Sequence, residues 1–126
     1  SPPAVMFLAH LVPMTRGILS SCYARLKDGA FPSYQVAREM VGELYREFYK
    51  NESFVKVCSS PPQTKQTWGN NLCLVYPTVD VRTGRLVVIS CLDNLVKGAA
   101  GQAVQNMNLM LDLPEATALE MLAIYP

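Results

Sequence analysis

Residues 98–111 restrict the possible folds of this chain most, because they contain no charged side chain. The stretch begins with small residues and continues through Val104, Met107 and Leu109, which leaves almost no polar face on a helix. A helix that is apolar nearly all round is normally buried. A chain of 126 residues offers little volume to bury it. We therefore infer that the natural partner of this helix is a domain outside the chain.

The overall composition agrees with a packed domain, or with one part of a larger domain. Half of the residues are hydrophobic and 17% are charged, which is enough apolar material for a core. The formal net charge is +1, and Lys and Arg are not clustered, so a nucleic-acid binder is not indicated. No apolar run approaches the roughly 20 residues of a membrane span. The low charge also favours a surface hidden against another chain or another part of the same chain.

The cysteine and histidine content argues against a metal site. The four cysteines are separated by wide, irregular gaps, and His10 is the only histidine, so no Cys-x-x-Cys or His-rich cluster exists. Without a secretory signal, we expect free, mostly buried thiols in a reducing compartment, the cytoplasm or a plastid or mitochondrion of a eukaryote. The chain opens Ser-Pro-Pro without an initiator Met, which predicts a processed, truncated or excised piece. The cysteines are Cys22, Cys58, Cys73 and Cys91.

The pattern of apolar residues predicts an α+β fold with a mainly antiparallel sheet. The one clear amphipathic helix begins after Ser33, a good N-cap residue. Gly84 suits the turn of a hairpin, and Pro77 indicates a sheet edge or a bulge. The apolar stripe of the helix consists of Val36, Met40, Leu44 and Phe48, widened by Ala37, Val41 and Tyr45. The expected elements are a buried strand 4–12, strand 18–27, helix 33–50, strand 54–57, a polar loop 59–70, strands 71–81 and 85–93, and helix 98–111.

The passage 93–102 is the first candidate for chemistry. It leaves a strand, runs through small residues and enters a helix, where unpaired backbone N–H groups attract an anion or the polar edge of a ligand. Small residues also let a ligand approach the backbone. Close helix packing through glycine and alanine explains the same residues, so both interpretations stay open.

Two long motifs and three short ones resemble the N-acetyl-gamma-glutamyl-phosphate reductases. The long ones are His10-Leu11-Val12-Pro13-Met14-Thr15-Arg16-Gly17-Ile18 and the passage from Asp93 to Asn108. The related aspartate-semialdehyde dehydrogenases share the start of the second motif but not the first. Ala9 and Asn70 depart from the proline and serine that the family pattern has there. The short motifs are 62–64, 69–73 and 113–119.

The resemblance implies a two-domain enzyme of which residues 1–126 are a single partial domain, the C-terminal catalytic and dimerisation domain. In that family an N-terminal Rossmann domain holds NADP, and the last helix returns to pack on it. The implied partners are therefore this Rossmann domain, a second copy of the chain and a small-molecule substrate, with no nucleic acid and no membrane. An alternative is a non-catalytic dimerisation module with the same fold.

The implied reaction belongs to arginine biosynthesis, and this chain is expected to lack its catalytic residues. A cysteine thiolate attacks an acyl phosphate, and NADPH then reduces the thioester, while a histidine handles the protons. The family places that cysteine in a Pro-Gly-Cys turn and the histidine in a Gly-His-x-His stretch, and neither occurs here. Cys58 is the most accessible thiol expected, but no base is close to it in sequence.

The site residues that the resemblance implies each have a second explanation. The substrate-binding set is His10, Arg16 and Asn71. His10 is also explained as a hydrogen-bonded core histidine, Arg16 as a turn-supporting surface arginine, and Asn71 as part of a dimer contact. In the cofactor-binding set, Lys97 is also explained as a solvated strand-end lysine and Gln102 as a helix-start residue that satisfies backbone groups. That set is Lys97, Gly98, Ala99, Gly101 and Gln102.

Overall fold

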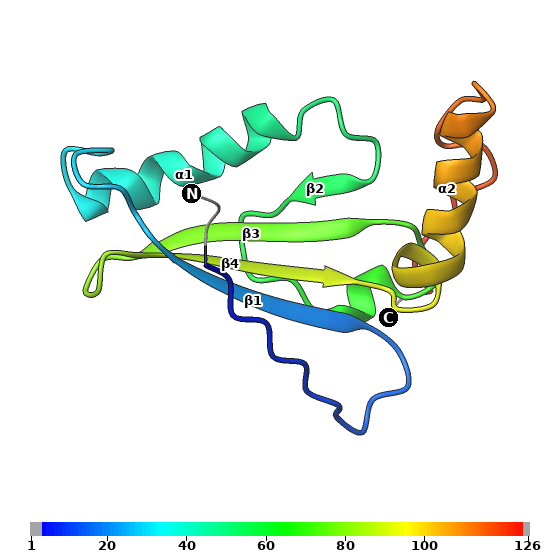
Figure 1. Ribbon diagram of the computed structural model, residues 1–126, viewed down its shortest axis with the longest axis horizontal. Coiled ribbons are helices and arrows are strands. Elements are labelled where there is room, and N and C mark those ends of the chain that lie inside the picture. Colours follow the sequence, from blue (N-terminus) through cyan, green and yellow to red (C-terminus); the bar gives the residue numbers. More distant parts are fainter. Residues whose placement is uncertain (1–3, 125–126) are drawn as a thin grey trace.

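The computed structural model describes residues 4–124 and confirms the α+β class (Figure 1). One four-stranded sheet carries helix α1 on one side, and helix α2 stands at one end of the sheet (Figure 1). No helix in this part of the chain is long and apolar enough to cross a membrane. The elements are β1 (Ile18–Arg25), α1 (Tyr34–Phe48), β2 (Val55–Val57), the 3₁₀ turn η1 (Thr64–Thr67), β3 (Cys73–Asp80), β4 (Arg85–Leu92), the π-helical turn η2 (Val96–Ala100) and α2 (Gly101–Met110).

The sheet has the strand order β1-β4-β3-β2. β4 pairs antiparallel with both β1 and β3, and only the short β2 pairs parallel, so the expectation of a mainly antiparallel sheet is confirmed. Because Cys22 and Pro77 both lie opposite Val88, these three side chains point to the same side of the sheet.

Pro77 lies in the part of β3 that has no neighbouring strand among the described residues on its outer side, as the sequence predicted for this proline. The backbone of β3 bonds toward β2 at Cys73 and Val75, so the missing N–H of Pro77 points the same way. β2 ends at Val57, opposite Val75, and Pro77 lies beyond that end. No ladder hydrogen bond is therefore lost.

The β3–β4 hairpin turns at Gly84, which has a φ of 65°. This left-handed conformation favours glycine, and a side chain there would also overlap the ring of Tyr34 at the start of α1. The hairpin expected at this glycine is thus confirmed, and it fixes the beginning of α1 against the sheet.

Helix α1 forms the small hydrophobic core with β3, but not through the stripe that its sequence predicts. Ser33 caps the helix by accepting a hydrogen bond from the N–H of Val36 at 3.2 Å, as expected. Ala37 and Val41 pack against Val79, and these three residues are at most 4% exposed. The predicted stripe was only half correct, because the apolar arc of α1 is wider than the surface that the sheet offers. Met40, Leu44 and Phe48 are exposed.

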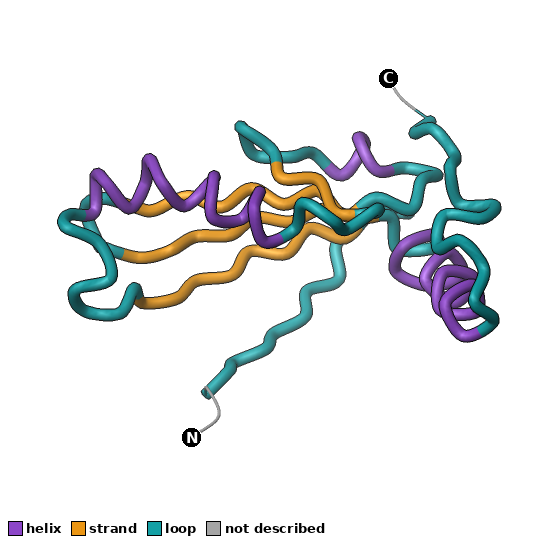
Figure 2. The backbone as a smooth tube through the Cα atoms, turned by 90° about the horizontal axis from the view of Figure 1, so that it is seen from above, coloured by secondary structure: helices purple, strands orange, loops and turns teal. Residues whose placement is uncertain are grey.

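The segment 4–12, predicted as a buried strand, is exposed and joins none of the described strands. Phe7 is 87% exposed and Leu11 is completely exposed. Figure 2 shows the segment running away from the sheet. The prediction of a buried strand was therefore wrong for this chain. An apolar run becomes a strand only where another strand satisfies its backbone, and nothing in the described residues does so.

Helix α2 turns its polar residues inward, which corrects the prediction of a helix with almost no polar face. Gly101, Gln105 and Asn108 are its buried residues. Met110 is 83% exposed, and Leu109 and the following Leu111 are also more than half exposed. The apolar side of α2 therefore lies uncovered in this chain, which agrees with the expectation that its partner lies outside the chain.

Candidate functional site

Asp93, at the end of β4, ties three separate segments together. Its side chain is completely buried. Oδ1 accepts hydrogen bonds from the backbone N–H groups of Leu95 at 2.8 Å and Val96 at 3.1 Å. Oδ2 accepts from the N–H of Gly69 at 2.7 Å and forms an ion pair with the guanidinium of Arg16. The carboxylate thus joins the chain before β1, the loop before β3 and the start of η2.

The hydrogen bonds around Asp93 hold it ionised. Burial opposes the charge and alone would raise the pKa of the carboxyl group, but the donated bonds from Gly69, Arg16, Leu95 and Val96 outweigh it. The pKa of Asp93 therefore lies below its ordinary value. A neighbouring contact reinforces the junction, because Asn94 Oδ1 accepts from the N–H of Gly17 at 2.7 Å.

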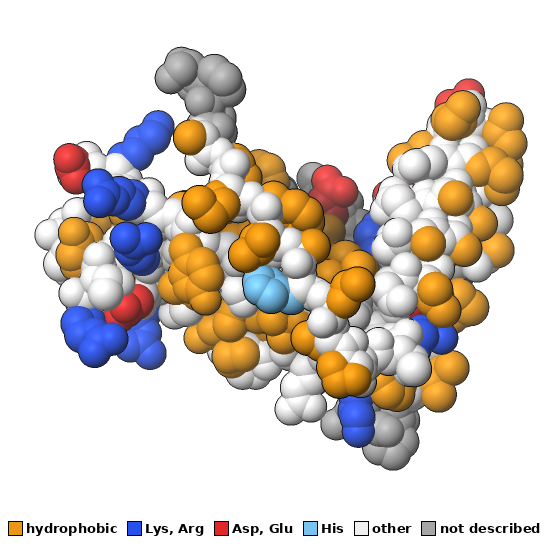
Figure 3. Space-filling view, turned by 60° about the horizontal axis from the view of Figure 1, so that its bottom comes forward, with side chains coloured by type: hydrophobic (Ala, Val, Ile, Leu, Met, Phe, Trp, Pro, Cys, Tyr) orange, Lys and Arg blue, Asp and Glu red, His pale blue; other side chains and the backbone are white. Residues whose placement is uncertain are grey.

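The predicted substrate residues Arg16 and His10 lie in different environments. Arg16 is directed to Asp93, its side chain is 31% exposed, and its Nε has no hydrogen-bond partner among the described residues. It is therefore more than a turn-supporting surface residue. His10 lies on the exposed segment 4–12, which excludes the explanation as a core histidine in this chain. Figure 3 shows this histidine among hydrophobic side chains on one face of the molecule.

The third predicted substrate residue, Asn71, is buried in a chain of amides. Its Nδ2 donates to Gln105 Oε1 at 3.0 Å, and its Oδ1 has no partner among residues 4–124. Gln105 in turn donates to Glu115 Oε1 at 2.6 Å, and Glu115 accepts from Ser53 at 2.9 Å. The network attaches the inner face of α2 to the loop just before β3, where Asn71 lies.

Lys97 belongs to the same network. Its Nζ donates to Gln105 Oε1 at 2.6 Å and lies 5.4 Å from the centre of the Phe54 ring. Burial lowers the pKa of Lys97, and the nearby Cys73 and Glu115 partly oppose this. The ammonium group is thus turned to the interior and is not the solvated strand-end lysine that the sequence also allowed.

The small residues after Lys97 form a π-helical turn with an exposed surface. The N–H of Gly98 bonds to the carbonyl oxygen of Asp93, and that of Ala100 to Leu95, each spanning five residues. Such turns are often found at functional sites. Gly98, Ala99 and Ala100 are exposed, so their backbone can be approached from outside.

Gly101 and Gln102 differ from these exposed residues. Gly101 is buried, and a side chain there would overlap Asn71 Oδ1, so close helix packing explains this glycine. Gln102 is half-buried and donates from Nε2 to Asn106 Oδ1 at 2.9 Å along the same helix. The predicted cofactor residues therefore fall into two groups. Gly98 and Ala99 form an exposed surface, whereas Lys97 and Gly101 lie on its inner side.

Three of the four thiols, Cys58, Cys73 and Cys91, show no sign of activation. No disulfide joins the four cysteines, which all lie in the described part of the chain. Burial raises the pKa of Cys58 and Cys73, and burial together with the neighbouring thiols raises that of Cys91 to about 11. Cys91 also donates to the carbonyl oxygen of Pro62. The expectation of mostly buried thiols was wrong, because Cys91 is buried, Cys58 and Cys73 are half-buried and Cys22 is exposed. Cys22, and not Cys58, is therefore the most accessible of the four.

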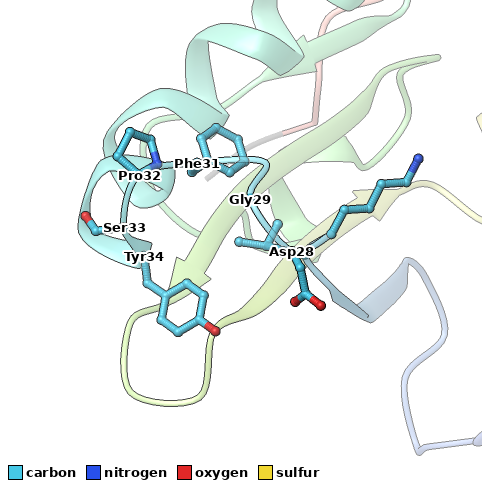
Figure 4. Close-up of a pocket in the computed structure, with 8 residues that line it drawn as sticks. Asp28, Gly29, Phe31, Pro32, Ser33 and Tyr34 are labelled. Atoms are coloured by element: carbon cyan, nitrogen blue, oxygen red, sulfur yellow. The ribbon is translucent and has the colours of Figure 1, made fainter.

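Several hollows lie away from this junction. The one in Figure 4, with a volume of about 410 Å³, follows the connection from β1 to α1 and includes Asp28 and Tyr34. None of the predicted site residues lines it.

Sequence reasoning missed the roles of Asp93, Gln105 and Glu115. The amide residues on the otherwise apolar sequence of α2 are a signal that could have indicated the role of Gln105.

Comparison with known proteins decides the family. A sequence profile described as semialdehyde dehydrogenase, dimerisation domain, matches residues 1–94. This chain belongs to the semialdehyde dehydrogenase dimerisation-domain family. The match includes the whole sheet and α1, and it ends just after Asp93.

Relatives whose names state an activity match the rest of the chain as well. A protein named N-acetyl-gamma-glutamyl-phosphate reductase from Dehalococcoides mccartyi is 59% identical over 98% of the chain. Proteins of the same name from Desulforamulus reducens and Heliobacterium modesticaldum are 51% and 49% identical over 100% and 98% of it. The chain spans only 34% to 35% of the length of these relatives.

Proposed function

We propose that this chain is the C-terminal part of an NADP-dependent N-acetyl-gamma-glutamyl-phosphate reductase of arginine biosynthesis. The observation that carries the proposal is the 59% identity to a protein of that name over 98% of the chain. The whole enzyme would interconvert N-acetylglutamate 5-semialdehyde, phosphate and NADP with the acyl phosphate and NADPH. NADPH, when bound, supplies the hydride of this reaction.

The junction at Asp93 supports a role in forming two walls of the active site. Asp93 fixes the guanidinium of Arg16, a group whose planar fork matches a carboxylate or phosphate of the substrate. The same carboxylate fixes the start of η2 through Leu95 and Val96. Substrate-facing and cofactor-facing segments would then share one rigid anchor.

The exposed surface of η2 fits a flat ring of a dinucleotide. Gly98, Ala99 and Ala100 present no side chain larger than a methyl group, so such a ring can approach the backbone. Gln102, in the next turn, would offer its amide to a carboxamide. Lys97 and Gly101 lie inward and would act by holding this surface in place.

The thiols support a supply of the nucleophile from outside the chain. A nucleophilic cysteine needs a lowered pKa, whereas those of Cys58, Cys73 and Cys91 are raised. We therefore expect no phosphate-dependent NADP reduction by the isolated 126 residues with N-acetylglutamate semialdehyde. Turnover by the isolated chain at a rate comparable to that of the longer protein would disprove this assignment.

The open side of the sheet favours a second role, in self-association. Leu19 and Tyr23, on the side of β1 away from α1, are 53% and 65% exposed. We expect this surface to pair with a second copy, as the family description suggests for its members. Sedimentation equilibrium measures this directly. A monomer at high protein concentration would refute association, and Tyr23→Lys should weaken it while the control Arg38→Lys should not.

The proposed role of Gln102 can be separated from a packing role. In the longer protein, Gln102→Ala should weaken NADPH binding or slow hydride transfer while the melting temperature stays unchanged. Gly98→Val should do more harm, since a branched side chain would occupy the approach surface and crowd Leu92 and Ile18. A lowered melting temperature with unchanged cofactor binding in Gln102→Ala would leave only helix packing.

A further inference from the structure

An apolar stripe on α1 has no use in the functions proposed above. Its members Met40, Leu44 and Phe48 are 47%, 51% and 76% exposed and recur every fourth residue. We call these three residues the α1 stripe. Two open hollows adjoin it, with volumes of about 500 Å³ and 350 Å³, and Leu44 lines both. Apolar surface arranged along a helix in this way marks a contact site.

The α1 stripe is continuous with the core of the domain. It borders the buried residues Ala37 and Val41, and Tyr45 beside it is partly buried against the same core. α1 packs mainly on β3, and β1 remains bare on the same side of the sheet, where Cys22 is exposed. A further element that covered the α1 stripe would therefore lie beside α1, on the same side of the sheet.

We propose that a helix from the part of the polypeptide outside this chain packs on the α1 stripe and completes this layer. The proposal rests on the proposed function only in taking the chain as part of a longer protein. The relatives have about two-thirds of their length beyond the matched region, which is ample for such a helix. An amphipathic helix would insert its own apolar residues between Leu44, Phe48 and the two tyrosines, Tyr45 and Tyr49, that line the larger hollow.

The charges beside the α1 stripe argue against a second copy as the occupant. Glu39, Glu43 and Glu47 follow the stripe at the same spacing and line the smaller hollow with it. In a two-fold contact each copy would bring the same acidic row to the interface. Arg46 and Lys50 offset two of these charges within the helix. The charge of Glu39 is not offset in this way among the described residues, so the row stays net negative, and the favoured occupant is a helix with a basic flank on the glutamate side.

Cysteine labelling tests the proposal at single positions. Leu44→Cys and Phe48→Cys are made separately in a Cys22→Ser background, both in this chain and in the longer protein. Labelling by a maleimide at each position is followed by peptide mass spectrometry. We expect both positions to label at least about tenfold more slowly in the longer protein than in this chain, at every protein concentration. Gln35→Cys, on the outer side of α1, is the control and should label equally in both.

Three outcomes are distinguishable. Slower labelling that is independent of concentration supports a helix of the same polypeptide. Equal labelling of positions 44 and 48 in the two proteins overturns the proposal, and so does protection that disappears on dilution, because it would identify a second copy. Reductase activity of the same longer protein is measured in parallel. If positions 44 and 48 are protected from labelling but the protein has no reductase activity, only the proposed function is refuted. If the protein is active but the two positions are not protected, only this inference is refuted.

Discussion

Replacing Asp93 by asparagine tests whether this carboxylate holds the three segments of the junction together. Asparagine keeps the shape, and its oxygen can still accept from the N–H groups of Leu95 and Val96. Its NH₂ group would then face two donors, the N–H of Gly69 and the guanidinium of Arg16. Leaving a buried donor unpaired costs about 1–3 kcal/mol. Arg16 is 31% exposed and keeps part of its hydration, so a total loss of about 2–4 kcal/mol is expected.

Urea unfolding of this chain measures that loss as a lowered midpoint at unchanged slope. Asp28→Asn, in an exposed loop, changes the net charge equally and should leave the midpoint nearly unchanged. The pH dependence adds a second readout, since the folded pKa of Asp93 is lowered. The stabilisation is complete above the unfolded pKa of about 3.9 and is lost as the pH falls through the lower folded pKa. Asp93→Asn should therefore lose less stability than the wild type on acidification. An Asp93→Asn midpoint within error of the Asp28→Asn control would refute the role of Asp93.

Three further predictions follow from individual contacts. Gly84→Ala should destabilise the chain by about 1–2 kcal/mol in urea unfolding, because φ is 65° and the methyl group would overlap Tyr34. Gly101→Ala should lower the thermal midpoint although alanine favours helices, because the methyl group would overlap Asn71; a raised midpoint would contradict the packing described. In thiol labelling followed by mass spectrometry at pH 8, the exposed Cys22 should react first and Cys91, with a pKa of about 11, last; fast labelling of Cys91 would contradict its burial.

Local sequence signals predicted the elements that local contacts decide. The alternation in β1, the N-cap at Ser33 and the hairpin glycine Gly84 each depend on neighbours a few residues away. The place of Pro77 at a sheet edge was also predictable, because a residue without an N–H cannot donate to a neighbouring strand. These features lie in the sequence, and the structure contains them close to the predicted bounds.

Features that depend on distant partners could not be predicted in the same way. The segment 4–12 has the composition of a buried strand, but burial requires a partner that residues 4–124 do not provide. The apolar residues of α1 are numerous enough for either of two faces to be buried. The contact with Val79 on β3 determines that Ala37 and Val41 are the buried ones. The ion pair of Arg16 with Asp93 joins residues 77 positions apart. The spacing of apolar residues along the sequence cannot predict a contact between such distant positions.

The most direct test of the reductase assignment is the substrate preference of the longer protein that contains this chain. NADP reduction is measured with phosphate and either N-acetylglutamate 5-semialdehyde or aspartate semialdehyde. We predict phosphate-dependent turnover with the first substrate, and a kcat/KM for the second that is lower by at least about a hundredfold, as expected when a site built for polar groups of one substrate leaves them unpaired with another. Preference for aspartate semialdehyde, or no turnover of either by the folded protein, would contradict the assignment.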